Sequence, residues 1–273
     1  MTSLYNVNYL QHLCQKYGLI PSKKYGQNFL INEEPIMAML EAGEIKKDDV
    51  VVEVGPGFGV LTLALGEKAK KVISYEIEKK LESYWTEQVE KNKNIEIVWG
   101  NVLNQNIDLR KYKVIANLPY QITSNVIRKF LEAENRPEFM VLMVQKEVAQ
   151  RICASPGDMS VLAVSVQCYG EPEIVMNVPK SYFWPVPGVD SAIIKIKNIK
   201  SDKIGEGFFK IVKSGFANRR KMLVKNLEPM VGKQNKEKLK KVFVDMKISE
   251  KVRAQELSIE QWQGLTSQIQ NIL

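Results

Sequence analysis

The sequence contains few of the residues that build metal centres and nucleophilic triads. Its 273 residues include one histidine, His12, and three cysteines, Cys14, Cys153 and Cys168. The cysteines show neither metal-binding nor redox spacing, and so small a number indicates a reducing cytosol. We therefore expect no bound metal, no histidine-based triad and a cytoplasmic location.

Long hydrophobic runs and low-complexity segments are also missing. No apolar run reaches the roughly 18 residues that a membrane-spanning helix needs, and the N-terminal residues show no signal pattern. We therefore expect neither export nor a membrane partner. No internal repeat is visible along the chain.

Positive charge is in moderate excess. Lysine and arginine number 39 against 31 aspartates and glutamates, which gives a net charge of +8. This balance favours a polyanionic partner, with nucleic acid as the leading candidate, whereas charge that serves only solubility is the alternative. The hydrophobic fraction of 45% is ordinary for a globular protein, so the chain can form a core.

Short apolar runs alternate with amphipathic stretches along most of the chain, as in an α/β sheet. Strands are predicted over 50–54, 71–77, 95–98, 113–115, 140–144, 173–178 and 191–197. Helices are predicted over 7–17, 60–65, 78–91, 122–132, 146–152 and 160–169. The composition changes near residue 199, so we expect a Rossmann-like α/β domain over 1–198 and a small all-helical domain over 199–273.

A glycine-rich turn follows the first predicted sheet strand. The pattern Glu53-x-Gly55-x-Gly57-x-Gly59 lets the backbone approach a cofactor closely. It is not the G-x-G-x-x-G of dinucleotide sites, which favours a cofactor with a smaller tail, such as S-adenosylmethionine. Glu76 ends the next strand, where a carboxylate accepts hydrogen bonds from ribose hydroxyls, although a surface carboxylate is the alternative.

The turn Asn117-Leu118-Pro119-Tyr120 follows the predicted strand 113–115 and therefore lies at its carboxyl end, where open α/β sheets bind ligands. The side-chain oxygen of Asn117 and the carbonyl of Leu118 are two acceptors, and Tyr120 offers a flat ring. This combination suits an amino group on a planar heterocycle. The alternative is a turn that simply follows a core strand.

Two loops and one basic segment complete the candidate sites. The loop 181–191 holds Tyr182, Phe183 and Trp184, which we expect to expose their rings as a second aromatic wall, unless they plug the sheet edge. The loop 21–30 is expected to fold back over the site, with a solvated linker as the alternative. In the helical domain, the basic face formed by Asn218-Arg219-Arg220-Lys221 and Lys225 is expected to contact nucleic acid, although most charge runs are solvated faces.

Taken together, these motifs closely resemble the small-subunit ribosomal RNA adenine N6,N6-dimethyltransferases over nearly the whole chain. The motifs that carry the resemblance are Lys24-Tyr25-Gly26-Gln27-Asn28-Phe29-Leu30, Glu53-Val54-Gly55-Pro56-Gly57-Phe58-Gly59, Asn117-Leu118-Pro119-Tyr120, Gln145-Lys146-Glu147-Val148, Phe183-x-Pro185-x-Pro187-x-Val189-x-Ser191 and Asn218-Arg219-Arg220. The resemblance implies a monomeric enzyme that methylates small-subunit ribosomal RNA within a pre-ribosomal subunit.

The resemblance also implies roles for individual residues. The S-adenosylmethionine contacts are expected from Asn28, Leu30, Gly55, Gly57, Glu76, Asn101 and Asn117. The catalytic group that holds the target adenine is expected to be Asn117, Leu118, Pro119 and Tyr120, with Phe183 stacking on the other face of the base. RNA contacts are expected from Lys23, Lys24, Arg219, Arg220, Lys221 and Lys225.

Three positions depart from the family's usual pattern. Asn101 stands where the family usually has aspartate, and Asn125 stands where it usually has proline. The loop Asp158-Met159-Ser160 lacks the usual Lys-x-Tyr-Gly insertion.

Two other functions stay open: a large-subunit adenine methyltransferase of the macrolide-resistance type, and a ribosome-assembly factor with weak catalysis. A DNA adenine methyltransferase would more often show proline at position 118.

Overall fold

The computed structural model describes residues 2–21, 27–201, 204–205 and 207–273. The chain divides into two compact units, Met1–Ala149 with Glu171–Ile199, and Gln150–Gly170 with Lys200–Leu273. The division near residue 199 is close to the predicted boundary. The prediction that residues 150–170 belong to the first domain is wrong, because this segment packs with the C-terminal helices.

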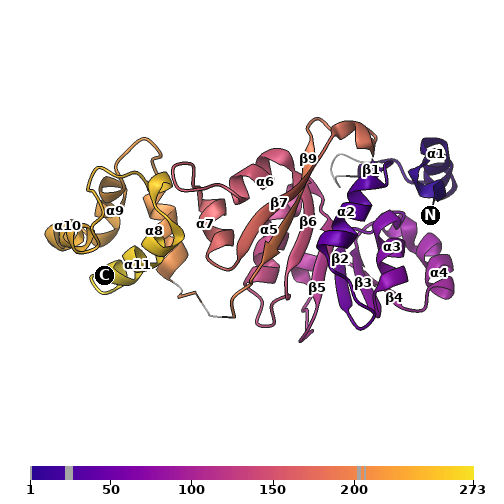
Figure 1. The fold of residues 1–273 in the computed structure, drawn as a ribbon, viewed down its shortest axis with the longest axis horizontal. Coiled ribbons are helices and arrows are strands. Elements are labelled where there is room, and N and C mark those ends of the chain that lie inside the picture. Colours follow the sequence, from indigo (N-terminus) through magenta and orange to yellow (C-terminus); the bar gives the residue numbers. More distant parts are fainter. Residues whose placement is uncertain (1, 22–26, 202–203, 206) are drawn as a thin grey trace. The chain divides into compact units, whose positions relative to one another are not determined.

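The first unit is built on a seven-stranded sheet of order β4-β3-β2-β5-β6-β9-β7 (Figure 1). The strands are β2 (Val50–Val54), β3 (Lys71–Glu76), β4 (Ile95–Trp99), β5 (Lys113–Asn117), β6 (Met140–Gln145), β7 (Glu171–Val178) and β9 (Ser191–Lys197). The five strands β2 to β6 pair in parallel, and β9 pairs antiparallel with both β6 and β7. The expected α/β sheet is therefore confirmed.

The apolar runs of the strands bury both faces of the sheet, as parallel sheets require. Five consecutive residues of β6, from Met140 to Val144, are fully buried. Val51, Ile115 and Met143 belong to a core cluster that also includes residues of the helices α1 to α4. The neighbouring strand residues point to the opposite face because side chains alternate along a strand.

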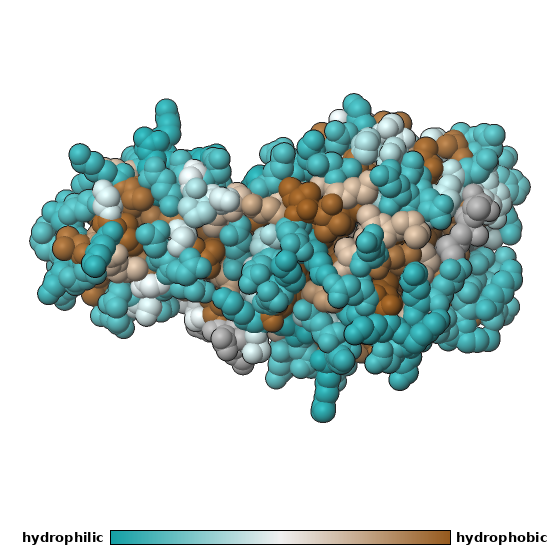
Figure 2. Space-filling model, in the orientation of Figure 1, coloured by the Kyte–Doolittle hydropathy of each residue, from teal (hydrophilic) through white to brown (hydrophobic). Residues whose placement is uncertain are grey.

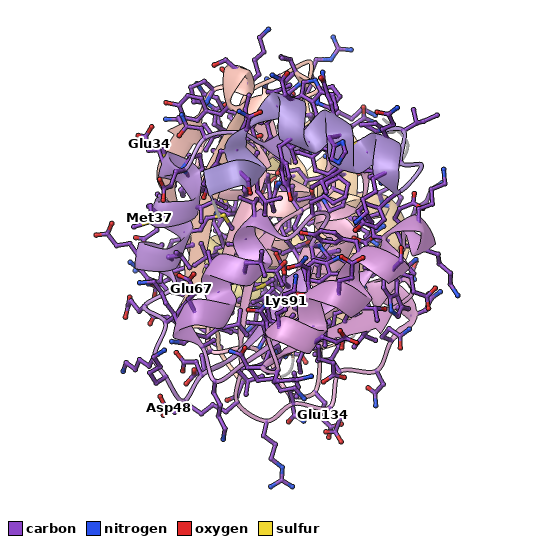
Figure 3. All side chains as sticks on the ribbon, turned by 90° about the vertical axis from the view of Figure 1, so that its right-hand side faces the viewer. Glu34, Met37, Asp48, Glu67, Lys91 and Glu134 are labelled. Atoms are coloured by element: carbon purple, nitrogen blue, oxygen red, sulfur yellow. The ribbon has the colours of Figure 1, made fainter. Side chains whose placement is uncertain are left out.

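Helices flank this sheet in the first unit. They are α1 (Val7–Lys16), α2 (Glu34–Ala42), α3 (Val60–Lys68), α4 (Glu82–Lys91) and α5 (Thr123–Leu131). Helix α6 (Lys146–Ile152) begins in the first unit, and its last three residues are assigned to the second. The amphipathic pattern of α5 buries Val126, Ile127 and Phe130. Charged side chains such as Glu67 on α3 and Glu134 after α5 point outward (Figure 3), and hydrophilic residues cover much of the drawn surface (Figure 2).

A second, very short sheet was not anticipated from the sequence. Strand β1 (Phe29–Leu30) pairs antiparallel with β8 (Phe183–Trp184), so the N-terminal loop is joined to the aromatic loop. Two residues per strand carry too little periodicity to be recognised as strands. This pairing positions residues 27–30 beside the main sheet.

The second unit is helical throughout the residues that the structure describes. Its helices are α7 (Val161–Gln167), α8 (Gly207–Gly215), α9 (Leu223–Val231), α10 (Lys236–Asp245) and α11 (Ile259–Gln270). Trp262 is fully buried and stacks on Phe216, with ring centroids 5.5 Å apart. Phe208 and Val212 of α8 are also buried, whereas Phe209 and Phe216 are half-buried.

Specific contacts explain why residues 150–170 join the helical unit. The backbone N–H groups of Gly157 and Met159 both donate to the carbonyl of Gln255. The ring of Tyr169 stacks on that of Phe209, with centroids 6.1 Å apart. These partners are distant in the sequence, so no local pattern reveals them. No helix within the described ranges is long and apolar enough to cross a bilayer.

Candidate active site

One cavity lies at the carboxyl ends of β2, β3, β4 and β5, where an open α/β sheet binds its ligand. All seven residues expected to contact the cofactor line it: Asn28, Leu30, Gly55, Gly57, Glu76, Asn101 and Asn117. Pro119 of the expected catalytic turn lines it as well. Leu4 and Leu10 also contribute, so the N-terminal segment forms part of the wall, which the sequence did not suggest.

The glycine-rich turn between β2 and α3 is held in a conformation that only glycine adopts easily. Gly59 caps α3 with a φ of 86°, and a β-carbon there would lie 2.7 Å from the ring of Trp85. The indole N–H of Trp85 donates to the carbonyl of Gly57 at 3.0 Å, and the hydroxyl of Tyr84 donates to that of Phe58 at 2.7 Å. Two side chains of α4 therefore hold the turn in place.

Glu76 is buried and aimed by backbone groups. Its Oε1 accepts from the N–H groups of Ile77 and Glu78, each at 2.7 Å, and its Oε2 accepts from that of Gly57 at 3.3 Å. Burial raises the pKa of this carboxyl, while the three N–H groups act in the opposite direction. The surface-carboxylate alternative is therefore wrong, and the carboxylate oxygens keep lone pairs that can accept further hydrogen bonds.

A second carboxyl, Glu53 at the end of β2, is even more deeply buried. Its side chain is 1% exposed, and the hydroxyl of Ser74 donates to its Oε2 at 2.6 Å. Burial raises the pKa of Glu53 to about 7, so the carboxyl holds a proton over much of the acidic range. Sequence reasoning used Glu53 only as the first letter of the glycine motif.

The expected catalytic turn follows β5 directly. Asn117 is the last residue of β5, and the N–H of Leu118 donates to the carbonyl of Met143 on β6 at 3.1 Å. The hydroxyl of Tyr120 makes a 2.8 Å hydrogen bond with the hydroxyl of Ser191. Burial is the main reason that the pKa of Tyr120 is raised, so the ring stays neutral. The turn is thus fixed to the sheet at both ends.

The aromatic loop differs from expectation. The ring of Phe183 is 1% exposed and belongs to the core cluster, so the prediction that it is exposed for stacking is wrong in this structure. Tyr182 and Trp184 are partly buried, and Trp184 stacks on Phe29 with centroids 6.2 Å apart. The alternative of a hydrophobic plug describes Phe183, because β8 turns its side chain inward.

The predicted RNA-binding residues fall in two places. Lys23 and Lys24 lie outside the described residues. Arg219, Arg220 and Lys221 are exposed on a turn of the second unit, and Lys225 is exposed but pairs with Glu228 at 3.0 Å. The buried amide of Asn226 donates to the carbonyls of Gly215 and Asn218, which fixes this turn. Sequence reasoning missed the role of Asn226.

The fold and the cavity define a Rossmann-like methyltransferase that uses S-adenosylmethionine. The buried carboxylate of Glu76, the glycine turn, and Asn117 and Pro119 of the Asn-Leu-Pro-Tyr turn line one cavity. In the part of the chain that the structure describes, no three His, Cys, Asp or Glu side chains are grouped to hold a metal ion.

A model of the family described as "Ribosomal RNA adenine dimethylase" matches residues 21–271, and the chain belongs to this family. "Ribosomal RNA small subunit methyltransferase A" of Fusobacterium nucleatum is 41% identical over 252 residues, which cover 88% of this chain and 94% of the relative. The protein of the same name from Bacillus licheniformis is 36% identical over 281 residues, covering 96% of each chain.

Two solved structures are also similar. A dimethyladenosine transferase from Plasmodium falciparum has a TM-score of 0.78 and 27% identity, covering 86% of this chain and 95% of that one. The 23S rRNA methyltransferase ErmE has a TM-score of 0.71 and 27% identity, covering 89% of this chain and 100% of that one.

Replacing Glu53 with glutamine should stabilise the protein at high pH. The folded state holds a proton up to about pH 7, whereas the unfolded chain loses it near the ordinary value of 4.5, so stability falls as pH rises between these values. We expect Glu53→Gln to gain up to about 3 kcal/mol at pH 8 and little at pH 4 in urea unfolding. The exposed Glu67→Gln is the control, and an equal effect at both pH values would contradict this prediction.

Substitutions at Phe183 should separate packing from base contact. Phe183→Ala is expected to lower the free energy of unfolding by about 3–5 kcal/mol, because it leaves a cavity in the core. Phe183→Leu keeps most of the volume and should cost less than about 1.5 kcal/mol. Because the ring is buried, we expect Phe183→Leu to retain most of the methyltransfer rate. A loss of about tenfold or more in a folded leucine variant would show that the ring reaches the base.

Proposed function

We propose that the protein transfers methyl groups from S-adenosylmethionine to N6 of two adjacent adenines near the 3′ end of small-subunit ribosomal RNA, giving dimethyladenosines. The observation that carries this proposal is the meeting of the glycine turn, Glu76 and Asn117 in one cavity. The names of the relatives from Fusobacterium nucleatum and Bacillus licheniformis support the small subunit as the source of the substrate.

The residues around the cavity suit the cofactor in charge and shape. The buried carboxylate of Glu76 would accept hydrogen bonds from the ribose hydroxyls, and the glycine turn leaves room for the backbone to approach the amino-acid tail. Asn28 and Leu30 enclose the same cavity from β1 and the residues before it. When bound, the cofactor supplies an electrophilic methyl group on its sulfonium.

The catalytic turn would activate the target base by position. The N6 of adenine is a weak nucleophile, because its lone pair is delocalised into the ring. Hydrogen bonds from the amino group to the side-chain oxygen of Asn117 and the carbonyl of Leu118 would favour a tetrahedral nitrogen, whose lone pair points at the methyl group. Correct orientation alone removes about 7–11 kcal/mol of barrier in favourable cases.

The substrate adenine must leave its stack to reach this cavity, which fits an unpaired base in a hairpin loop. Two methyl groups per base require space for a methyl already on N6. The second unit would hold the RNA backbone through the basic turn at Arg219, Arg220 and Lys221. We further propose that the protein acts as a monomer in the cytoplasm on a pre-ribosomal subunit.

The direct test is incubation with labelled S-adenosylmethionine and undermethylated small ribosomal subunits, followed by mapping of the modified bases. We expect label in two adjacent adenines of the small-subunit RNA, both dimethylated. Label found only in large-subunit RNA would contradict the proposal and favour the second candidate, a large-subunit methyltransferase. That candidate is kept because of the structural similarity to the 23S rRNA methyltransferase ErmE.

Substitutions at Tyr120 should test the stacking surface. Tyr120→Ala is expected to lower turnover by roughly five- to 150-fold, because stacking on a base is worth about 1–3 kcal/mol. Tyr120→Phe keeps the ring, and Ser191→Ala removes only the hydroxyl partner, so both should retain most of the activity. Binding of S-adenosylhomocysteine should stay unchanged in all three. Equal losses in the Ala and Phe variants would show that the hydroxyl, and not the ring, matters.

Removing the basic turn should weaken RNA binding in a salt-dependent way. The triple variant changes Arg219, Arg220 and Lys221 to alanine. We plot the logarithm of its RNA-binding constant against the logarithm of the salt concentration, and expect the slope to flatten by about 0.7–0.9 for each phosphate that the variant no longer neutralises. The matched control changes Lys233, Lys238 and Lys241 to alanine, which removes the same charge from exposed positions elsewhere in this unit. Equal slopes for both triple variants would show that the turn is an ordinary solvated surface and does not contact the RNA.

A further inference from the structure

The position of the cofactor's base, which rests on the proposed function, follows from the order of the strands. Glu76 ends β3, and β4 pairs with β3 on the side away from β2 and its glycine turn. A nucleoside whose ribose lies at Glu76 therefore directs its base toward the residues after β4. These residues are Gly100, Asn101 and Val102, and all three line the cavity.

The short helix η4 (Val102–Asn104) fixes the backbone at this position. The N–H of Gly100 donates to the carbonyl of Glu76 at 2.7 Å. The ammonium of Lys129 on α5 donates to the carbonyls of Leu103 and Gln105, at 3.3 and 2.7 Å. This loop is therefore held on both sides, and the groups that it presents to the cavity are set before the cofactor binds.

The orientation of the Asn101 amide is set by this helix. Its Oδ1 accepts from the N–H of Leu103 at 3.0 Å and so caps η4. If the amide turned over, its NH2 group would meet the N–H of Leu103, and two donors would face each other. The oxygen is thus committed to the helix, and the NH2 group is the part of the amide left for the cavity.

The loop therefore presents two hydrogen-bond donors from consecutive residues. Among the described residues, neither the Nδ2 of Asn101 nor the backbone N–H of Val102 has a hydrogen-bond partner. The N–H of Val102 matches the ring nitrogen N1 of adenine, which is an acceptor. The 6-amino group next to N1 is itself a donor, so it would need an acceptor at the position where Asn101 presents another donor.

We propose that Asn101 removes selection for the 6-amino group of the cofactor's base, so that the site recognises this base through ring nitrogens and apolar contact. A carboxylate at this position keeps one oxygen on the N–H of Leu103 and aims the second at the 6-amino group. The identity of a single atom, nitrogen or oxygen, then decides whether the site reads position 6 of the purine.

The test compares two ligands on two proteins by calorimetric titration. The ligands are S-adenosylhomocysteine and its 6-desamino analogue, in which hydrogen replaces the amino group and N1 remains an acceptor. The native protein is expected to bind both within about threefold. Asn101→Asp, which keeps the cap on η4, should prefer the amino compound by about tenfold or more, because a hydrogen bond to a charged acceptor is worth about 1.5–3 kcal/mol.

Asn104→Asp is the matched control, because it makes the same chemical change at the exposed end of η4. It should discriminate between the two ligands no better than the native protein. The proposal is overturned if the native protein prefers the amino compound as strongly as Asn101→Asp does. Failure of the native protein to bind either ligand would instead contradict the proposed cofactor site itself.

Discussion

The turn after β2 is the constraint on which the rest of the site depends. Its backbone bends through left-handed glycines, and Trp85 and Tyr84 of α4 hold it by two hydrogen bonds to its carbonyls. The same turn donates its Gly57 N–H to the carboxylate of Glu76. The end of β3 and the start of α3 are thereby coupled, so the proposed ribose anchor and the proposed tail pocket cannot move independently.

The proposed chemistry uses this rigidity, because methyl transfer from an activated cofactor depends mainly on alignment. Asn117 ends β5, a strand paired on both sides within the sheet, and the N–H of Leu118 is tied to β6. The cofactor pocket and the acceptor groups for the target amine therefore lie on neighbouring strands of one sheet. Small errors in the reacting distance are costly, and a paired central strand limits such errors.

Two expectations failed because they concern partners distant in sequence. The alternation of aromatic residues and prolines around Phe183 says nothing about which face the ring occupies, and the pairing of β8 with β1 turned it into the core. Residues 150–170 carry an ordinary helical pattern, yet Gln255 and Phe209 attach them to the C-terminal helices. Burial of this kind is decided by tertiary contacts, which local propensity does not encode.

The sequence by itself determined the α/β class, the positions of the five parallel strands, and a set of residues, expected to contact the cofactor, that line one cavity. It did so because buried strands read as apolar runs and because glycine and asparagine stand where the strands end. Only the tertiary structure decided the burial of Glu53, the inward turn of Phe183 and the orientation of Asn101. Each of these depends on a partner supplied by another element or by the folded turn: Ser74 for Glu53, β1 for Phe183 and the η4 backbone for Asn101.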